Sequence, residues 1–332
     1  MSTAILSPVW ETPETVCSAQ SKGDRPLIDV RLFVLGLAGF FWGGLTTPLS
    51  IHLARRYGIM DIPDARKIHT VQMPRGGGLG LWAGYLLLSL YLVEGQPSQR
   101  FIVTGATLIF LCGYLDDMCS LNPFLRLGLH FLAASMAVLP LGLSPLTAAV
   151  ALIWVAGMTS AYNLIDGVNG LCISLFIAAS MALFCLRSPG GMAVGTCMGA
   201  MALGVLCWNF PTAQTFLGDG GSTLLGYLFA SHFVTSALSA LGKKAETGGT
   251  VRFHELILLL LLFGGVPVLD TLVAFSRRIL EGKSPFYPDK GHLHHLLISL
   301  TGSPLWSVSV LLVLQVITLA GGLAVYTRLL AR

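Results

Sequence analysis

Residues 127–165, LGLHFLAASMAVLPLGLSPLTAAVALIWVAGMTSAYNLI, run for 39 positions without an aspartate, glutamate, lysine or arginine. A helix needs about 20 mostly apolar residues to cross the roughly 30 Å hydrocarbon core of a bilayer. The stretch is long enough for two such helices, and Pro140-Leu-Gly-Leu-Ser-Pro145 supplies a break between them. It therefore predicts a pair of membrane-spanning helices.

The rest of the chain has the same character. Of its 332 residues, 54% are hydrophobic and only 11% are charged, whereas soluble domains carry about 25% charged residues. The mean hydropathy is +0.75. This composition argues against a soluble enzyme, a secreted disulfide scaffold and a disordered regulator. The net charge of +4 is too small and too scattered to indicate nucleic-acid binding. We therefore expect an all-α, polytopic membrane protein.

Ten segments are predicted to span the membrane. Two lie within 127–165, and the others are 32–54, 76–93, 101–115, 167–186, 192–208, 221–242, 254–276 and 305–327. The ninth contains Gly264, Gly265 and Pro267, which predict a kink. Residues 1–26 are polar and lack the basic start and apolar core of a signal peptide, so they are predicted to form a tail. Residues 27–332 are predicted to form a single transmembrane domain.

Acidic residues are concentrated on one predicted face. Short connections between ten helices put 55–75, 116–126, 163–170, 209–221 and 277–300 on the same side. This side holds Asp61, Asp64, Asp116, Asp117, Asp166, Asp219, Glu281 and Asp289, and the loops of the other side hold only Glu94 and Glu246. Lysine and arginine number ten in these loops and five in the opposite loops, although the tails bring the two sides level. The loop count favours the cytoplasm for the acidic face.

Two segments of this face are cationic. Arg66, Lys67 and His69 precede Arg75 and three glycines, which predicts a flexible phosphate-binding loop. Anchoring to lipid headgroups is the alternative. The second cationic segment contains Lys290, His292, His294 and His295. These histidines lack the further ligands of a zinc site and suit a diphosphate. The start of an amphipathic interfacial helix is the alternative.

Three further segments carry carboxylates. The adjacent Asp116 and Asp117 repel each other, which indicates a divalent metal, a cationic partner or a solvated helix end. The turn after Asn163 aims this residue and Asp166 at one ligand. Asp219 precedes two glycines and Ser222, which is expected to cap the following helix. A helix N-terminus favours phosphate, and a carboxylate beside it can hold a metal, although a simple capping turn has the same pattern. Asp270, inside an apolar helix, is a further functional candidate.

Taken in order, these segments resemble the signatures of the polyprenyl-phosphate N-acetylhexosamine-1-phosphate transferase superfamily (glycosyltransferase family 4), which includes WecA-type and MraY-type enzymes. The matching pieces are Arg66-Lys67-x-His69, Asp116-Asp117, Asn163-x-x-Asp166-Gly167, Phe216-x-Gly218-Asp219-x-Gly221-Ser222 and His292-x-His294-His295. Three consecutive histidines characterise the peptidoglycan branch, whereas Leu293 interrupts them here. The departure favours the branch that uses UDP-linked N-acetylhexosamines over a phospho-N-acetylmuramoyl-pentapeptide transferase.

The resemblance implies transfer of an N-acetylhexosamine-1-phosphate, GlcNAc-1-phosphate first, from a UDP-sugar to undecaprenyl phosphate, with release of UMP. This reaction would start a lipid-linked cell-envelope glycan at the cytoplasmic face of the cell (inner) membrane. A homodimer is left open.

The same resemblance implies roles for individual residues. Mg²⁺, with Mn²⁺ as the alternative, would be held by Asp219 with Asp116 and Asp117 nearby, and the tandem aspartates would also position the lipid phosphate. Asn163 and Asp166 would contact the nucleotide, and His292, His294 and His295 its diphosphate. The remaining predicted substrate-binding residues are Arg66, Lys67, His69, Arg75, Asp270 and Lys290. Since a phosphate monoester is mostly ionised at pH 7, direct in-line attack is preferred to a covalent aspartyl intermediate.

Two alternatives come from other functional classes. A secondary transporter would place its acids near the bilayer midplane on broken helices. An aspartate-rich prenyltransferase would continue Asp116-Asp117 with a third acid, where this chain has Ser120. Release of UMP rather than pyrophosphate would distinguish sugar-phosphate transfer from prenylation.

Overall fold

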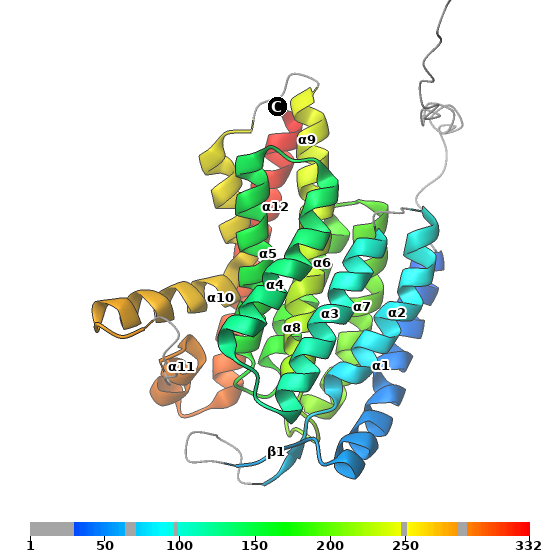
Figure 1. The fold of residues 1–332 in the computed structure, drawn as a ribbon, viewed down its shortest axis with the longest axis vertical. Helices are drawn as coiled ribbons and strands as arrows, with labels where there is room; N and C mark the ends of the chain where they lie inside the picture. The colour runs from blue at the N-terminus through cyan, green and yellow to red at the C-terminus, as the bar shows by residue number, and fades with distance from the viewer. Residues whose placement is uncertain (1–29, 64–70, 96–98, 247–250, 285–290) are drawn as a thin grey trace, which may run out of the picture.

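The computed structural model describes residues 30–63, 71–95, 99–246, 251–284 and 291–332. These ranges are almost entirely helical (Figure 1), which confirms the all-α class. The α-helices are α1 (Val30–Tyr57), α2 (Gly77–Gly95), α3 (Gln99–Met118), α4 (Pro123–Val138), α5 (Pro145–Ile165), α6 (Leu171–Cys185), α7 (Pro189–Asn209), α8 (Gly218–Phe233), α9 (Ser239–Glu246), α10 (Phe253–Leu280), α11 (Leu293–Thr301) and α12 (Pro304–Ala331). The π-helical turn Val234–Leu238 joins α8 directly to α9.

Every predicted span coincides with a helix. Within the described ranges, eight helices are long and apolar enough to cross a membrane. Two shorter apolar helices, Gly77–Leu90 and Leu171–Cys185, lie where the second and sixth spans are predicted. The sixth begins four residues later than expected, because the turn that ends at Gly170 (φ +76°) precedes it. The predicted tail lies outside the described residues.

Four helices, α4, α5, α7 and α12, begin at a polar residue followed by proline, and in the first three the polar side chain caps the helix. Asn122, Ser144 and Ser188 accept a hydrogen bond from the first turns of α4, α5 and α7, and a proline follows each of them. Proline suits the first helical position because the N–H that it lacks would have no partner within the helix. The break predicted between residues 140 and 145 is confirmed by the end of α4 and the capped start of α5.

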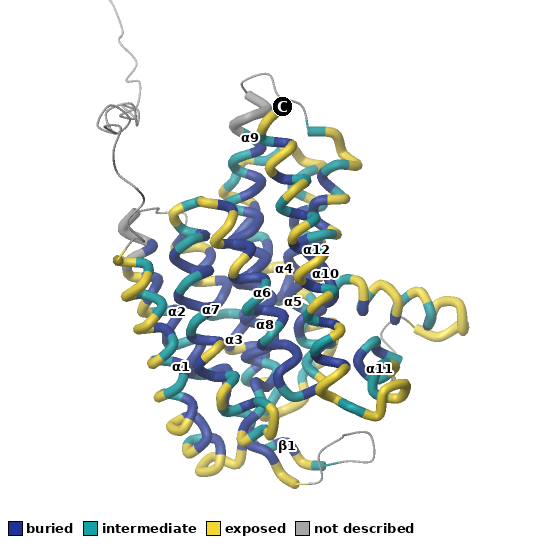
Figure 2. The backbone as a smooth tube through the Cα atoms, turned by 180° about the vertical axis from the view of Figure 1, so that it is seen from behind, coloured by how far each residue is buried: buried dark blue, intermediate teal, exposed yellow. Residues whose placement is uncertain are grey.

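Helix α8 forms the centre of the bundle. It packs against α2, α3, α5 and α6, and nearly all of its residues are buried, as its dark blue colour in Figure 2 shows. Helix α1 packs along α7 on one side of the bundle. Its outer face exposes large apolar side chains such as Phe33, Phe41 and Leu45. In a bilayer, this composition suits contact with lipid.

Helix α10 is broken at Gly265, whose φ and ψ are 52° and −139°. The kink predicted for this segment is confirmed. Beyond the break, the second half of α10 leaves the bundle and projects sideways, with α11 beneath it (Figure 1). The Trp154 indole N–H donates to the Leu260 carbonyl at 3.0 Å, and the Val266 N–H donates to Gln315 Oε1 at 2.7 Å. Side chains of α5 and α12 thus bind backbone groups near the break.

A small antiparallel pair of strands closes one end of the bundle. Strand β1 (Met60–Asp61) pairs with β2 (Met73–Pro74). The end of β2 and the start of α2 are held to the loop before α8, because the Phe216 N–H donates to the Pro74 carbonyl at 2.9 Å and the Gly77 N–H donates to the Phe216 carbonyl at 3.0 Å. The strands and α11 lie toward the same end of the molecule (Figure 1). This end contains the predicted acidic face.

Candidate active site

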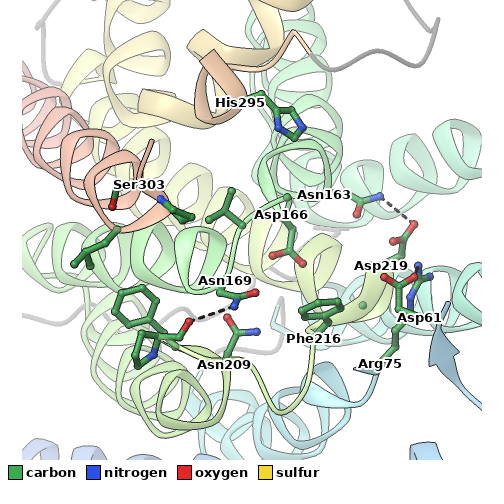
Figure 3. Close-up of a pocket in the computed structure, with 17 residues that line it drawn as sticks. Asp61, Arg75, Asn163, Asp166, Asn169, Asn209, Phe216, Asp219, His295 and Ser303 are labelled. Carbon is green, nitrogen blue, oxygen red and sulfur yellow. Dashed lines mark hydrogen bonds and ion pairs between the residues drawn. The ribbon is translucent and has the colours of Figure 1, made fainter. Parts of the chain in front are cut away.

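A cavity of about 680 Å³ opens at the strand end of the bundle. Its walls come from four of the five predicted segments, from the end of α7 and from the start of α12. Figure 3 shows Asp166, Asp219 and Arg75 in this cavity, with His295 across from them. The fifth predicted segment, which contains the tandem aspartates, reaches the site through contacts with cavity residues. The sequence prediction that these segments converge is thus confirmed, whereas the roles of the single residues stay predictions.

Asp117 binds the protein's own backbone. Its Oδ1 accepts the Asp219 N–H at 3.0 Å and its Oδ2 accepts the Gly220 N–H at 3.3 Å. Its side chain is only 1% exposed. Negative charge at a helix N-terminus is favourable because the unpaired N–H groups carry partial positive charge. Asp117 therefore anchors the start of α8 to the end of α3.

This arrangement corrects the expected cap of α8. The helix begins at Gly218 rather than at residue 221, and Ser222 lies inside it. The Ser222 hydroxyl has hydrogen bonds with the Gly218 carbonyl at 3.1 Å and with Asn163 Oδ1 at 3.0 Å. The capping group comes from Asp117 because its buried carboxylate reaches the first-turn N–H groups directly. Ser222 instead links α8 to α5.

Arg75 joins the strand pair to the helices. Its guanidinium donates to Asp117 Oδ1 at 2.8 Å and also pairs with Asp61. Burial acts to lower the pKa of Arg75, but the charges of Asp117 and Asp61 outweigh it and raise this pKa. The predicted substrate-binding residue is therefore held as a cation at the cavity wall.

Asp219 faces the cavity from the first turn of α8. Its side chain is 27% exposed, and its Oδ2 accepts from Asn163 Nδ2 at 3.2 Å and from Arg126 Nη1 at 3.1 Å. The same Arg126 nitrogen pairs with Asp116, whose other oxygen accepts the Leu121 N–H at 2.5 Å. Asp116 and Asp219 thus share one cationic partner at the edge of the site.

Among the described carboxylates of the site, Asp166 has the fewest hydrogen bonds and ion pairs. It follows the last residue of α5 and points into the cavity (Figure 3). Its carboxylate has no hydrogen-bond or ion-pair partner among the residues that the structure describes. Burial raises the pKa of Asp166 to about 7, and the negative charges of Asp219 and Asp117 act in the same direction. An acceptor of this kind is available to a cation or to a donor on a ligand.

Asp270 does not line the cavity. Its side chain is buried, one oxygen accepts from His292 Nδ1 at 2.7 Å and the other accepts the Leu293 N–H at 2.6 Å. Asp270 thereby caps α11 and holds the residue before it. The geometry does not support the expected substrate contact, because both of its oxygens already accept hydrogen bonds from the protein.

The three histidines have different surroundings. His292 is bound by Asp270 and lies 3.5 Å from Arg278 Nη2. His294 is buried, and a Cβ on Gly167 would lie only 2.5 Å from its Nε2. Burial lowers the pKa of His294 to about 4, helped by the neighbouring His295, so this ring is neutral at pH 7. Among the three, only His295 lines the cavity.

Four predicted site residues, Arg66, Lys67, His69 and Lys290, lie outside the described residues. In return, the structure adds Asp61 and Arg126 to the site, and it places Phe216 of the fourth motif in the cavity wall. The available signal for Arg126 was its place ten residues after Asp116. Nothing in the sequence indicated that Asp61 would be buried against Arg75.

The carboxylates at the cavity fit a magnesium ion better than a metal with a complete protein cage. Within the described ranges, no group of three or more histidine, cysteine, aspartate and glutamate side chains forms such a cage. Mg²⁺ is usually held by one or two carboxylates together with substrate phosphates and water. Asp219 and Asp166 face the cavity and suit this arrangement, with Asp116 beside Asp219. The oxygens of Asp117 are already used by α8 and Arg75.

Comparison with known proteins agrees with this geometry. The family described as Glycosyl transferase family 4 matches residues 100–237, which include Asp116, Asp166 and Asp219. A Bacillus subtilis (strain 168) protein named probable undecaprenyl-phosphate N-acetylglucosaminyl 1-phosphate transferase is 30% identical over 310 residues, covering 85% of this chain and 81% of its own.

Relatives in other bacteria show a similar extent of likeness. An undecaprenyl-phosphate alpha-N-acetylglucosaminyl 1-phosphate transferase of Thermotoga maritima is 30% identical over 277 residues, or 81% of this chain and 82% of the relative. A decaprenyl-phosphate N-acetylglucosaminephosphotransferase of Mycobacterium leprae is 29% identical over 313 residues, or 81% and 77%. Since the likeness extends over most of both chains, the protein belongs to glycosyl transferase family 4.

Proposed function

We propose that this chain transfers GlcNAc-1-phosphate from UDP-GlcNAc to a polyprenyl phosphate. In this reaction, an oxygen of the lipid phosphate attacks the sugar-linked phosphorus of the donor. The bond from this phosphorus to the oxygen that bridges the two donor phosphates breaks, and UMP leaves. The products are GlcNAc-diphosphate-polyprenyl and UMP. The names of the relatives support this choice of sugar and acceptor.

One observation carries the proposal: Asp219, Asp166, Asn163 and His295, from three separate chain segments, meet at one cavity at the end of an apolar helical bundle. A lipid phosphate and a water-soluble nucleotide can meet at such a place. A transporter would instead place its acids near the middle of the bundle.

Magnesium would be held by Asp219 and Asp166. Asp116 lies beside Asp219 and would be a further ligand. When bound, the ion would neutralise the negative charge of the phosphates, which otherwise repel each other. Mn²⁺ is the alternative because it also takes oxygen ligands. Asn163 would keep Asp219 oriented, since its amide binds Asp219 on one side and Ser222 on the other.

The other walls suit the two ends of the donor. Phe216 and Asn169 line the cavity, and Asn169 Nδ2 donates to the Pro211 carbonyl at 3.2 Å. An aromatic ring with a nearby amide suits a planar nucleobase, because it combines stacking with hydrogen bonding. His295 and Arg75 would contact the phosphates from opposite sides of the cavity.

We place the cavity on the cytoplasmic face of the cell membrane. The reason is the excess of lysine and arginine, ten against five, in the loops of the site end. Arg66, Lys67, His69 and Lys290 belong to these loops and would add positive charge around the donor phosphates.

Membranes that contain the full chain provide the test. They would be supplied with polyprenyl phosphate, Mg²⁺ and, in parallel reactions, labelled UDP-GlcNAc, UDP-GalNAc or UDP-MurNAc-pentapeptide. We expect labelled lipid and an equal amount of UMP from UDP-GlcNAc, no product in EDTA, and no product from Asp219→Asn. Folded protein that makes no labelled lipid from any of the three donors would overturn the proposal.

A further inference from the structure

The buried Gln315 of α12 is joined to the active site by a short series of contacts. Gln315 is 0% exposed and lies near the middle of its helix. Its Oε1 accepts the Val266 N–H of α10 at 2.7 Å. Its amide also occupies the space that a side chain on Gly265 would need. Gln315 of α12 thus packs directly against the break in the neighbouring helix α10.

The break requires an acceptor of this kind. Gly265 has a positive φ, so the regular pattern of hydrogen bonds stops there. A buried N–H without an acceptor costs about 1 to 3 kcal/mol, and more in surroundings that exclude water. Gln315 Nε2 has no hydrogen-bond partner within the described residues. A buried amide with one unbound polar group lowers the stability of the protein. We therefore attribute the presence of Gln315 to the geometry of the break that it holds.

The geometry of the break decides where Asp270 lies. Asp270 follows Val266 by four residues, about one helical turn, on the half of α10 that leaves the bundle (Figure 1). From there its carboxylate binds His292 and the Leu293 N–H, so it fixes the start of α11. Helix α11 carries His295 into the cavity wall. Gln315 is therefore linked to His295 by direct hydrogen bonds and by two short stretches of helix, residues 266–270 of α10 and 293–295 of α11.

We infer that Gln315 is a positioning residue for the transfer reaction: it holds the break in α10 and thereby sets the position of the histidine-bearing helix α11. This inference rests on the proposed function. Gln315 itself touches neither substrate. Its influence passes through α10 and Asp270.

Two substitutions and a control test the inference in the full chain in nanodiscs. Gln315→Leu removes the acceptor, whereas Gln315→Glu, neutral in an apolar interior, keeps a carbonyl oxygen for Val266. Thr318→Val is the matched control, because Thr318 lies one turn away on α12 and its hydroxyl, within the described residues, bonds to the Gln315 carbonyl of its own helix alone. Hydrogen exchange of peptides that cover 291–301 reports on α11, and kcat and KM for UDP-GlcNAc report on the site.

We expect Gln315→Leu to increase exchange in 291–301, to raise KM about tenfold, and to lower kcat about 10- to 100-fold, since a misplacement of about 1 Å has effects of this size. Gln315→Glu should recover most of each loss, and Thr318→Val should match the wild type. A merely structural role would lower the amount of active protein without changing KM or the exchange of α11.

Wild-type exchange in 291–301 and an unchanged KM in Gln315→Leu would overturn the inference. If this variant does not fold, Gln315→Asn replaces it, because its shorter side chain cannot reach Val266. The same two results, wild-type exchange and an unchanged KM, would then overturn the inference. The exchange measurement needs no substrate. An inactive wild type would therefore refute the proposed function, whereas altered exchange would still establish the link between α12 and α11.

Discussion

At the scale of single residues, the tandem aspartates show how one sequence motif divides into two environments. Neighbouring residues on a helix point about 100° apart, so both carboxylates cannot face the same ligand. Asp117 turns inward and binds Arg75 and the first turn of α8. Asp116 turns toward Arg126 and Asp219. The pair therefore combines an anchor with a residue of the site.

Asp117→Asn should destabilise the protein, whereas Asp219→Asn should not. The first substitution removes a buried charge that binds Arg75 and two backbone N–H groups. Breaking a buried charge pair costs about 3 to 5 kcal/mol. Thermal unfolding in detergent micelles would show a lower midpoint for Asp117→Asn alone, although both variants lose activity. Equal midpoints would contradict the anchoring role.

Asp166 should make the stability of the protein depend on pH. Burial raises its pKa from 3.8 to about 7 in the folded state, so between these values the folded chain binds a proton that the unfolded chain has released. Stability must therefore fall as pH rises through this window, and the loss is complete above about pH 7. Asp166→Asn has no such proton.

Unfolding midpoints of wild type and Asp166→Asn, measured from pH 4 to pH 8 in EDTA, check this prediction. We expect the wild type to lose stability relative to the variant up to about pH 7 and then to run parallel to it. Parallel curves over the whole range would show that Asp166 is not perturbed by folding.

At the scale of helices, the sequence predicted those features that depend on residues close together in the chain. The charge-free runs predicted the spans, and Asn122-Pro123 and Ser144-Pro145 mark helix starts because cap and proline act within one turn. The cap of α8 could not be predicted in this way, since Asp117 lies 102 positions before the Asp219 N–H that it binds. Asp270 was likewise expected to contact substrate. Its actual partners, His292 and the Leu293 N–H, lie far along the chain and reach it only because α10 bends.

The contact between α11 and the end of α5 should be sensitive to a single methyl group. In Gly167→Ala, the new Cβ would lie 2.5 Å from His294 Nε2. The buried His294 ring must then shift, and we expect α11 to move with it and to carry His295. We expect activity to fall about tenfold or more, as misplacement of site residues does. The unfolding midpoint should change little, because α11 lies at the edge of the bundle (Figure 2).

Gly157→Ala is the matched control, because Gly157 lies in α5, the helix that leads into the turn of Gly167. Nothing lies within 4 Å of a Cβ at this position, and alanine favours a helix by up to about 1 kcal/mol over glycine. This variant should keep full activity. If Gly167→Ala is equally active, α11 does not depend on close packing against the turn.

At the scale of the whole molecule, the site exists only because the helices alternate in direction. Its side chains come from the ends of α3, α5 and α8 and from α11, which are separated by long apolar stretches. Asp219, Asp166 and His295 lie on three different segments, so no single segment supplies the whole cavity. The bundle brings them together at one surface, and the membrane supplies the lipid substrate to the same place.

The alternation can be tested along one helix. Helix α3 has 20 residues, about 30 Å of length, which matches the hydrocarbon core. Arg100 is exposed in its first turn, and Cys119 is exposed just beyond its last residue, at the end that carries the site. One probe would be a chain that keeps Cys119 and has its six other cysteines replaced by serine. The other would be Arg100→Cys in a chain without native cysteines.

A thiol reagent that cannot cross membranes should label Cys119 only when it reaches the cytoplasmic side, in inverted vesicles. The cysteine at position 100 should react only in intact cells with a permeable outer layer. The difference is expected because a helix of this length and apolar composition cannot return to the side on which it began. If both positions react from the same side, α3 does not cross the membrane, and the loops that build the cavity cannot all share one face.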